Sequence, residues 1–292
     1  MHTYTHCPVC GANEFSEFLT CKDYTVSKED FAIVSCKGCG FKFTNPRPDN
    51  DKLGDYYKSE DYISHSNTKK GLISQLYHRV RKITLKQKVE LVSGYVSRGT
   101  ILDYGCGTGA FLQACIEHGW KGFGMEPDKG ARQFAFESGL NVSENKETLE
   151  NKTPDLKFNA ITLWHVLEHV TDLDETLAYF KTKLIRDGVL IIAVPNHRSF
   201  DAQFYGAHWA AYDVPRHLYH FAPDTIEKLM QKHGFRLEAM HPMKFDSFYV
   251  SMLSEKYKTG KINYISAFMK GLSSNMRTKS AGDYSSVIYV FR

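Results

Sequence analysis

The chain has 292 residues and a mass of 33.4 kDa, more than one average domain, so a main domain with an appendage is expected. Hydrophobic residues make up 42% of the sequence and charged residues 24%, which is ordinary for a soluble globular protein. The net charge of +4 and the pI of about 8.5 are too mildly basic to demand a nucleic-acid partner.

The sequence predicts a cytoplasmic protein. The first ten residues contain no apolar segment of a signal peptide. The longest apolar run, Val189 to Val194, is far too short to span a bilayer. In the cytoplasm the seven cysteines are more often bound to metal or free than joined in disulfides.

Residues 1–46 contain two C-x-x-C pairs, Cys7 with Cys10 and Cys36 with Cys39, and each pair is followed by glycine. A tight turn after such a pair lets two thiolates converge on one cation, and four thiolates form a closed tetrahedral site. The pattern resembles a zinc ribbon, which implies a structural zinc ion held by these four cysteines. A redox pair or unrelated thiols are the alternatives.

Residues 47–96 are predicted to form a helical linker or cap. The sequence Asn45-Pro-Arg-Pro-Asp49 interrupts regular structure, and a helix is expected from about Gly71 to Tyr95. This segment carries a basic run, which is either a solvated helix face or a surface that attracts phosphates. The run consists of Lys69, Lys70, Arg79, Arg81, Lys82, Lys86 and Lys88.

The most specific motif is the segment TILDYGCGTGA, residues 100–110. A short apolar run reaches Asp103, and Gly105, Gly107 and Gly109 follow before an apolar-periodic stretch. This order predicts a strand, a glycine-rich turn and the start of a helix. Glycines allow a sharp turn and close approach of a ligand, and the helix N-terminus favours a negative group. A nucleotide-like ligand is therefore expected, an ordinary strand–helix turn being the alternative.

Strands and helices are predicted to alternate after this turn, which indicates an α/β fold with a parallel sheet. The expected strands are 121–125, 158–164, 189–194, 235–240 and 285–291, and the expected helices are 110–118, 129–138, 174–184 and 223–233. In the helix 129–138, the periodicity predicts that Ala131, Phe134, Ala135 and Ser138 form the core-facing side. Residues 243–282 are polar and helical without a recognisable motif.

Glu126 follows the second of these strands, 17 residues after Gly109. An acid at this place can accept both ribose hydroxyls of an adenosine, as it does in the dinucleotide-binding fold. The alternative is an acid that only stabilises the start of the next helix.

Three segments carry a family resemblance. The pattern D-x-G-C-G-x-G resembles motif I of the class I S-adenosylmethionine-dependent methyltransferases. The strings WHVLEHVTDLDETL and LIRDGVLIIAVPN resemble the small-molecule branch that includes the ubiquinone-biosynthesis O-methyltransferases. The resemblance covers residues 97–292 and implies a Rossmann-like seven-stranded sheet that binds S-adenosylmethionine. The implied cofactor-binding residues are Asp103, Gly105, Gly107, Gly109, Glu126 and Trp164.

The end of the fourth strand departs from the branch. Some members bind a divalent metal there through an acid and a Glu-His pair, whereas this chain has Glu168 and His169 but His165 in place of the first acid. Magnesium prefers oxygen ligands, so the sequence leaves open whether a metal binds here, and a structural role is favoured for Glu168 and His169. His165 is expected to touch the methyl-transfer site, because the strand opens there onto the ligand crevice.

The loop 212–221, YDVPRHLYHF, resembles a block of the same branch. Its acid, arginine and histidines suit the recognition of a polar or anionic substrate and the removal of its proton. His217 is predicted as the general base, with His165 as the second choice. The predicted substrate-binding residues are Tyr212, Asp213, Arg216 and His220. Alternatively, the polar groups hydrogen-bond one another and hold the loop.

Three tyrosines before motif I, Tyr56, Tyr57 and Tyr62, either cap the cofactor and substrate, as this segment does in related methyltransferases, or pack against the core. The sequence thus predicts a methyltransferase for a small-molecule acceptor, with O-methylation favoured because a hydroxyl needs a base. Carbon and nitrogen acceptors stay open. The alternatives are an RNA base methyltransferase with an RNA-recognising ribbon, and a non-catalytic cofactor-binding interaction protein.

Overall fold

The computed structural model describes residues 1–58 and 72–292. The chain folds into two compact units, of which the first comprises Met1–His65, Leu167–Thr176 and Ala193–Tyr289. The second comprises Ser66–Val166, Leu177–Ile192 and Val290–Arg292. Tyr62, Lys69 and Lys70 lie outside the described residues, as does the side chain of Arg79.

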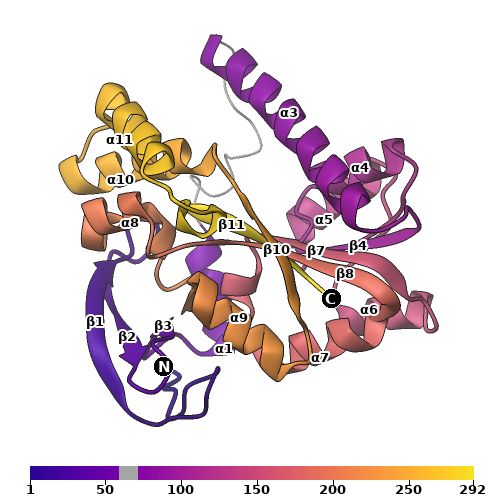
Figure 1. Ribbon diagram of the computed structural model, residues 1–292, viewed down its shortest axis with the longest axis horizontal. Coiled ribbons are helices and arrows are strands. Elements are labelled where there is room, and N and C mark those ends of the chain that lie inside the picture. The colour runs from indigo at the N-terminus through magenta and orange to yellow at the C-terminus, as the bar shows by residue number, and fades with distance from the viewer. Residues whose placement is uncertain (59–71) are drawn as a thin grey trace. The chain divides into compact units, whose positions relative to one another are not determined.

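A seven-stranded sheet has the strand order β10-β11-β8-β7-β4-β5-β6, and it confirms the predicted α/β class (Figure 1). Its strands are β4 (Thr100–Tyr104), β5 (Lys121–Met125), β6 (Val142–Ser143), β7 (Phe158–Trp164), β8 (Leu184–Pro195), β10 (Leu237–Pro242) and β11 (Ser286–Phe291). In the second unit, β4 pairs in parallel with β5 and β7, and β5 with β6. Strands buried on both faces read as continuous apolar runs, as β7 and β8 do.

The helices that accompany these strands are α3 (Leu72–Tyr95), α4 (Ala110–Glu117), α5 (Lys129–Glu137), α6 (Lys146–Lys152) and α7 (Leu173–Lys183). The prediction for the buried side of α5 was wrong, because only Ala135 is buried there and the side chain of Phe134 is 58% exposed. Ala135 belongs to a buried cluster with Leu112, Leu140 and Val142. Periodicity identifies residues that share a face, but here the neighbouring elements cover only a narrow strip of that face.

The cysteine-rich segment of the first unit forms a second sheet. Strands β1 (Phe15–Lys22), β2 (Asp30–Cys36) and β3 (Lys42–Thr44) are antiparallel, and the short helices α1 (Asn50–Leu53) and η1 (Gly54–Tyr57) follow. The fourth strand is β9 (Tyr219–His220) from the loop 212–221, which pairs with β3 through Lys42 opposite His220 and Phe43 opposite Tyr219. The cysteine-rich segment, called the ribbon from here on, and the loop 212–221 therefore share one sheet.

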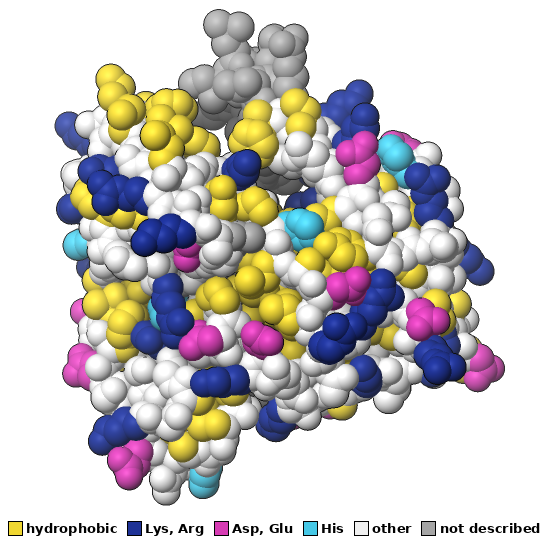
Figure 2. All heavy atoms as spheres, viewed as in Figure 1, with side chains coloured by type: hydrophobic (Ala, Val, Ile, Leu, Met, Phe, Trp, Pro, Cys, Tyr) yellow, Lys and Arg dark blue, Asp and Glu magenta, His cyan; other side chains and the backbone are white. Residues whose placement is uncertain are grey.

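The rest of the first unit is mainly helical. It contains η3 (Leu167–His169), α8 (Phe200–Tyr205), η4 (Gly206–His208), η5 (Ala210–Tyr212), α9 (Pro223–Lys232), α10 (Asp246–Thr259), α11 (Tyr264–Met276) and η6 (Ala281–Asp283). Helices α10 and α11 lie side by side, and hydrophobic side chains gather with lysines and arginines over them (Figures 1 and 2). Within the described parts of the chain, no helix combines the length and apolar character needed to cross a bilayer.

The carboxylate of Asp201 fixes the helices of this region. It is fully buried and accepts hydrogen bonds from Trp209 Nε1, Ser274 Oγ and Ser285 Oγ at 2.7, 2.7 and 2.6 Å. A buried carboxylate is stable only when its oxygens are hydrogen-bonded. Asp201 therefore holds α8, α11 and the start of β11 together.

A second buried network joins the ribbon to the loop 212–221. Asp23, at the turn between β1 and β2, accepts hydrogen bonds from the backbone of Thr25 and Ser27 at 2.9 and 2.7 Å. It also forms an ion pair with Arg216 at 3.1 Å, and both side chains are almost fully buried. Arg216 donates two further hydrogen bonds to Asp213 at 2.9 and 2.6 Å. The guanidinium is thus shared between two carboxylates from distant parts of the sequence.

We expect Asp23→Ala to lower the free energy of unfolding by about 3–5 kcal/mol, because it leaves a buried arginine with half of its counter-charge. The measurement is urea unfolding at neutral pH.

Burial alone would raise the pKa of Asp23, but hydrogen bonds from Ser27 and Thr25 and the charge of Arg216 hold it well below its usual value. Its contribution is therefore complete above pH ~4 and is lost as the pH falls below that value.

Asp55→Ala is the matched control, since the ion pair of Asp55 with Lys58 is exposed. That variant should unfold at the urea concentration of the unmodified protein. Equal urea midpoints for Asp23→Ala and Asp55→Ala would contradict the structural role assigned to Asp23.

Candidate functional site

The glycine turn between β4 and α4 has three left-handed glycines, with φ of +74° at Gly105, +54° at Gly107 and +80° at Gly109. A Cβ at Gly105 would lie 2.5 Å from the side chain of Val166, and one at Gly109 would lie 2.2 Å from Leu140. A Cβ at Gly107 would meet nothing within 4 Å. The outer glycines are thus required by conformation and packing, and the middle one leaves space beside its Cα where a ligand can approach.

Glu126 reaches this turn from the end of β5. One carboxylate oxygen accepts the backbone N–H of Gly107 and the other accepts that of Asp128, both at 2.8 Å. Burial raises the pKa of this carboxyl group, which is only 9% exposed. The structure therefore brings the predicted ribose-binding acid directly to the middle glycine.

Asp103 lies at the end of β4 and is almost fully buried. Its Oδ1 accepts a hydrogen bond from Thr162 Oγ1 at 2.9 Å. Burial raises the pKa of Asp103 to about 7, although Thr162 and the charge of Lys88 act in the opposite direction. A carboxylate with this pKa gains from a cationic ligand, since a positive group stabilises its charged form.

Trp164 is the last residue of β7 and His165 follows it, both in the same unit. The Trp164 ring packs edge-on against Phe111, and the ammonium of Lys88 lies 4.1 Å from the ring centroid. Its buried indole N–H has no hydrogen-bond partner among the described residues, which leaves a donor available for a ligand. His165 has φ of +57°, a strained value for a residue with a Cβ, and such strain concentrates at functional sites.

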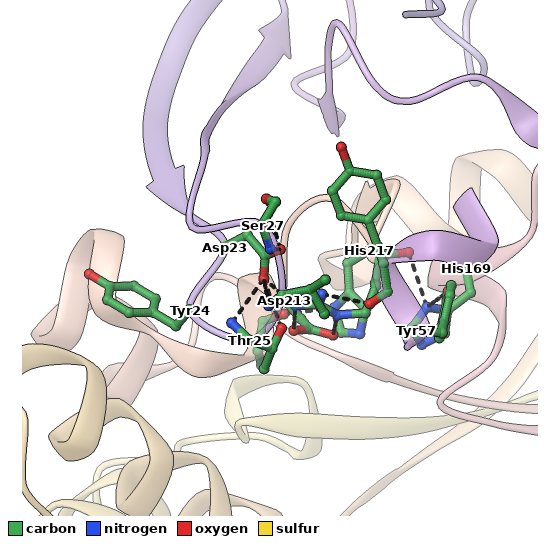
Figure 3. Close-up of polar contacts among 12 residues, drawn as sticks. Asp23, Tyr24, Thr25, Ser27, Tyr57, His169, Asp213 and His217 are labelled. Atoms are coloured by element: carbon green, nitrogen blue, oxygen red, sulfur yellow. Dashed lines mark hydrogen bonds and ion pairs between the residues drawn. The ribbon is translucent and has the colours of Figure 1, made fainter. Parts of the chain in front are cut away.

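A cluster of Glu168, His169 and His217 forms in the first unit, where η3 meets the loop 212–221. Figure 3 shows the two histidines of this cluster. One ligand atom from each of the three side chains lies within 4.8 Å of the others. The two imidazole rings stand edge to face with centroids 4.6 Å apart. Two nitrogens and a carboxylate oxygen are a donor set that a divalent transition metal accepts, and they are also the parts of a proton-transfer group.

Backbone carbonyls set the orientation of both rings. His217 Nδ1 lies 2.9 Å from the Ala211 oxygen, and His169 Nδ1 lies 3.0 Å from the Arg216 oxygen and 2.9 Å from the Tyr57 hydroxyl. A carbonyl oxygen can only accept a hydrogen bond, so each Nδ1 is assigned the proton and each Nε2 the basic lone pair. Burial, with the charge of His217, lowers the pKa of His169 to about 4, which keeps this ring neutral.

The other predicted substrate residues are buried around the same loop. Tyr212 packs edge-on against His220 and Trp209, with centroids 5.4 and 5.0 Å apart. His220 Nε2 lies 3.2 Å from Thr44 Oγ1, and burial holds the pKa of His220 well below its usual value. Asp213 and Arg216 form an ion pair with each other. This is the contact expected if the polar groups of the loop hydrogen-bond one another and hold the loop, the alternative to substrate binding.

The structure joins His217 to residues that sequence reasoning had treated as structural or had overlooked. Glu168 and His169 lie beside it, whereas His165 belongs to the other unit. Asp23 and Thr44 were overlooked: Thr44 Oγ1 donates to the His217 carbonyl at 2.8 Å. Their only sequence signal was a polar residue close to the end of a strand, which is too common to single out. Of the predicted capping tyrosines, Tyr57 contacts His169 and the Tyr56 carbonyl accepts from Arg216 at 3.0 Å.

The four N-terminal cysteines converge on one point. Cys7 Sγ lies 3.6 Å from Cys39 Sγ, Cys10 Sγ lies 3.5 Å from Cys36 Sγ, and all four sulfurs are within 4.8 Å of one another. Both pairs use the same turn: the N–H of Gly11 donates to the Cys7 carbonyl and that of Gly40 to the Cys36 carbonyl, with φ near +76° at each glycine. Tetrahedral zinc with Zn–S bonds of about 2.3 Å requires sulfurs about 3.8 Å apart, so this arrangement is compatible with a zinc site.

Comparisons with known proteins agree with this geometry. A family model described as a methyltransferase domain matches residues 74–240, more than half of the chain. An uncharacterized methyltransferase of Geobacillus kaustophilus is 30% identical over 147 residues, or 46% of this chain and 68% of the relative. A ubiquinone biosynthesis O-methyltransferase of Serratia proteamaculans is 32% identical over 101 residues, which cover 32% of this chain and only 42% of the relative.

Solved structures show the same fold at low identity. The magnesium protoporphyrin IX methyltransferase from Synechocystis, with bound SAH, is 13% identical with a TM-score of 0.52, and the match covers 83% of this chain and 99% of that one. A SAM-dependent methyltransferase from Archaeoglobus fulgidus is 18% identical with a TM-score of 0.50, over 72% of this chain and 93% of that one. The chain therefore belongs to the methyltransferase domain family and is a class I S-adenosylmethionine-dependent methyltransferase.

Proposed function

We propose that this methyltransferase acts on a hydroxyl group of a polar small-molecule acceptor and that His217 removes the hydroxyl proton. The observation that carries this proposal is the fixed orientation of His217, whose Nδ1 is held by the Ala211 carbonyl so that Nε2 is available as a base. Similarity to ubiquinone biosynthesis O-methyltransferases supports an oxygen acceptor, although the chain spans less than half of the Serratia relative.

The donor-binding role falls to residues of the second unit. S-adenosylmethionine, when bound, supplies an electrophilic methyl group on a sulfonium. The open backbone of Gly107 between Gly105 and Gly109 supports close approach of this cofactor. Asp103 would meet its amino group, Glu126 its ribose hydroxyls, and the indole N–H of Trp164 would donate to one of its acceptors.

The acceptor-binding role falls to the cluster around His217. His217 Nε2 would accept the hydroxyl proton, and the Glu168 carboxylate nearby would stabilise the resulting imidazolium. Arg216 and Asp213 hold the loop that carries this histidine, while Tyr212 and His220 pack beside it. His165, with its strained backbone at the end of β7, is the second choice of base.

We also propose a structural zinc ion at Cys7, Cys10, Cys36 and Cys39. The sulfur distances and the two matching turns support it. Four thiolates leave no open coordination position, so the ion would serve folding rather than catalysis. Burial raises the pKa of Cys7 strongly, and zinc binding must therefore displace protons from this site.

We expect His217→Ala to lower methyl transfer by about 10²–10⁴-fold, the usual contribution of a general base. The protein is incubated with labelled S-adenosylmethionine and small molecules from a cell extract, and the product is identified by mass. The affinity for the cofactor should change by less than about twofold, because His217 is assigned to the acceptor. His208→Ala, in η4 before the loop and outside the cluster, should keep full turnover.

Two results would count against the base assignment. One is full turnover in His217→Ala, and the other is a loss that disappears when cofactor is saturating. Labelled product in RNA rather than in small molecules would instead refute the small-molecule acceptor.

Cofactor binding should depend on the ionisation of Asp103. Below its pKa of about 7 the carboxyl group is neutral, and binding a cationic amino group then requires loss of a proton. We expect the dissociation constant of S-adenosylmethionine to rise up to about tenfold per pH unit between pH ~7 and pH ~5. Asp103→Asn should bind more weakly at pH ~8 and should lack this dependence in calorimetric titrations.

The matched control is Asp128→Asn. Asp128 caps α5 by accepting the Ala131 N–H at 2.7 Å, and asparagine is an equally good cap. This variant should keep the pH dependence of the unmodified protein. The same steep dependence in Asp103→Asn would show that another group titrates.

Elemental analysis should find about one zinc ion per chain, and Cys10→Ser with Cys36→Ser should contain none, because the two remaining thiolates are too few ligands to retain the ion. Cys21→Ala, which removes a buried cysteine of β1 outside the cluster, should keep the ion. A folded, zinc-free preparation of the unmodified protein would exclude the proposed site. Metal that persists in this double variant would place an ion at Glu168, His169 and His217 instead.

A further inference from the structure

Helix α11 packs through small residues and exposes large apolar ones. Its buried residues are Ala267, Gly271 and Ser274. At Gly271 the helix approaches α10 so closely that a Cβ would lie 2.7 Å from the Phe248 ring. The opposite side, here called the α11 face, consists of Tyr264, Ile265, Phe268, Met269 and Met276.

The α11 face is strongly exposed. The side chains of Ile265, Met276 and Phe268 are 80%, 75% and 56% exposed. At about 100° per residue, the five positions fall within roughly 140° of the helix circumference. A continuous apolar stripe of this kind marks an interaction surface, because single exposed apolar residues would be scattered.

Positive charge surrounds the stripe. Six cations and no acid occur between Glu255 and Asp283, namely Lys256, Lys258, Lys261, Lys270, Arg277 and Lys279. The ammonium groups of Lys258 and Lys270 lie 4.9 and 3.9 Å from the Phe204 ring centroid, and the guanidinium of Arg277 lies 4.5 Å from that of Phe200. These three charged groups therefore lie over aromatic rings of α8 in cation–π contacts.

We propose that the α11 face docks on an anionic lipid bilayer, with α11 lying in the plane of the interface. Helices that bind in this way place aromatic and aliphatic side chains among the lipids and lysines or arginines at the headgroups. Each cation near an anionic leaflet adds to the attraction. The interaction is independent of methyl transfer and involves none of the residues assigned to donor or acceptor.

The same features disfavour other occupants. Protein interfaces are depleted in lysine, whereas five of the six cations here are lysines. A symmetric contact between two copies would set the positive segment against itself. A nucleic acid would attract the cations but would leave Ile265 and Met276 in water.

The test is co-sedimentation of the full chain, without cofactor or acceptor, with vesicles of phosphatidylglycerol and phosphatidylcholine in equal parts. We expect binding at low salt, weaker binding at high salt, and much weaker binding to pure phosphatidylcholine vesicles. Ile265→Ser with Phe268→Ser should lower the partition coefficient about tenfold or more. Lys261→Gln should lower it about fivefold, since this exposed lysine forms none of the ring contacts of Lys258 and Lys270.

The matched control is Phe134→Ser with Phe136→Ser in α5, two aromatic residues with exposures of 58% and 69%. It should bind vesicles as the unmodified protein does, and unchanged urea unfolding should accompany both double variants. Absence of vesicle binding, or equal binding by the α11 and α5 variants, would overturn the proposal. So would self-association of the unmodified chain in sedimentation velocity that the α11 variant abolishes, because a second copy would then cover the face.

Discussion

The burial of Arg216 constrains the first unit more than any other interaction. The Arg216 side chain is only 2% exposed. Its charge must be balanced and its N–H groups hydrogen-bonded, because otherwise the free-energy cost of removing it from water would exceed the free energy gained from its contacts. Asp213 lies three residues away, but Asp23 comes from the ribbon turn and the Tyr56 carbonyl from η1. The same residue uses its backbone carbonyl to orient His169, and His217 follows it directly. One buried cation thus fixes the ribbon, the loop and both histidines relative to one another.

The donor side is built by a different principle. Its geometry follows from the local conformation of eleven residues, since three left-handed glycines bring the chain from β4 into α4. Glu126, a charged partner from outside the turn, directly follows the strand next to β4 in the sheet. A short motif can therefore specify donor binding in sequence, whereas the acceptor side requires contacts between residues up to about two hundred positions apart, such as Asp23 and Arg216.

This difference explains what sequence could predict. Strands β5 and β7 have the expected bounds, Lys121–Met125 and Phe158–Trp164, because their apolar runs are bounded by clear signals. The exposure of Phe134 was not predictable, since periodicity orients a helix but does not say how much of it a neighbour covers. The pairing of β9 with β3, and the contacts of Tyr57 and Thr44 with the two histidines, depend on tertiary structure and leave no local pattern.

The shared sheet also connects the four cysteines to the loop 212–221. Strand β3 begins three residues after Cys39, and it pairs directly with β9, the end of the segment that carries His217. Thr44, the last residue of β3, holds the His217 carbonyl, and β1 ends one residue before Asp23. Cys36 is the last residue of β2, so convergence of the four thiols at one point also bears on the strands that reach the loop. An ion at the cysteines would act structurally, and through β3 and Asp23 it would set the position of the proposed base.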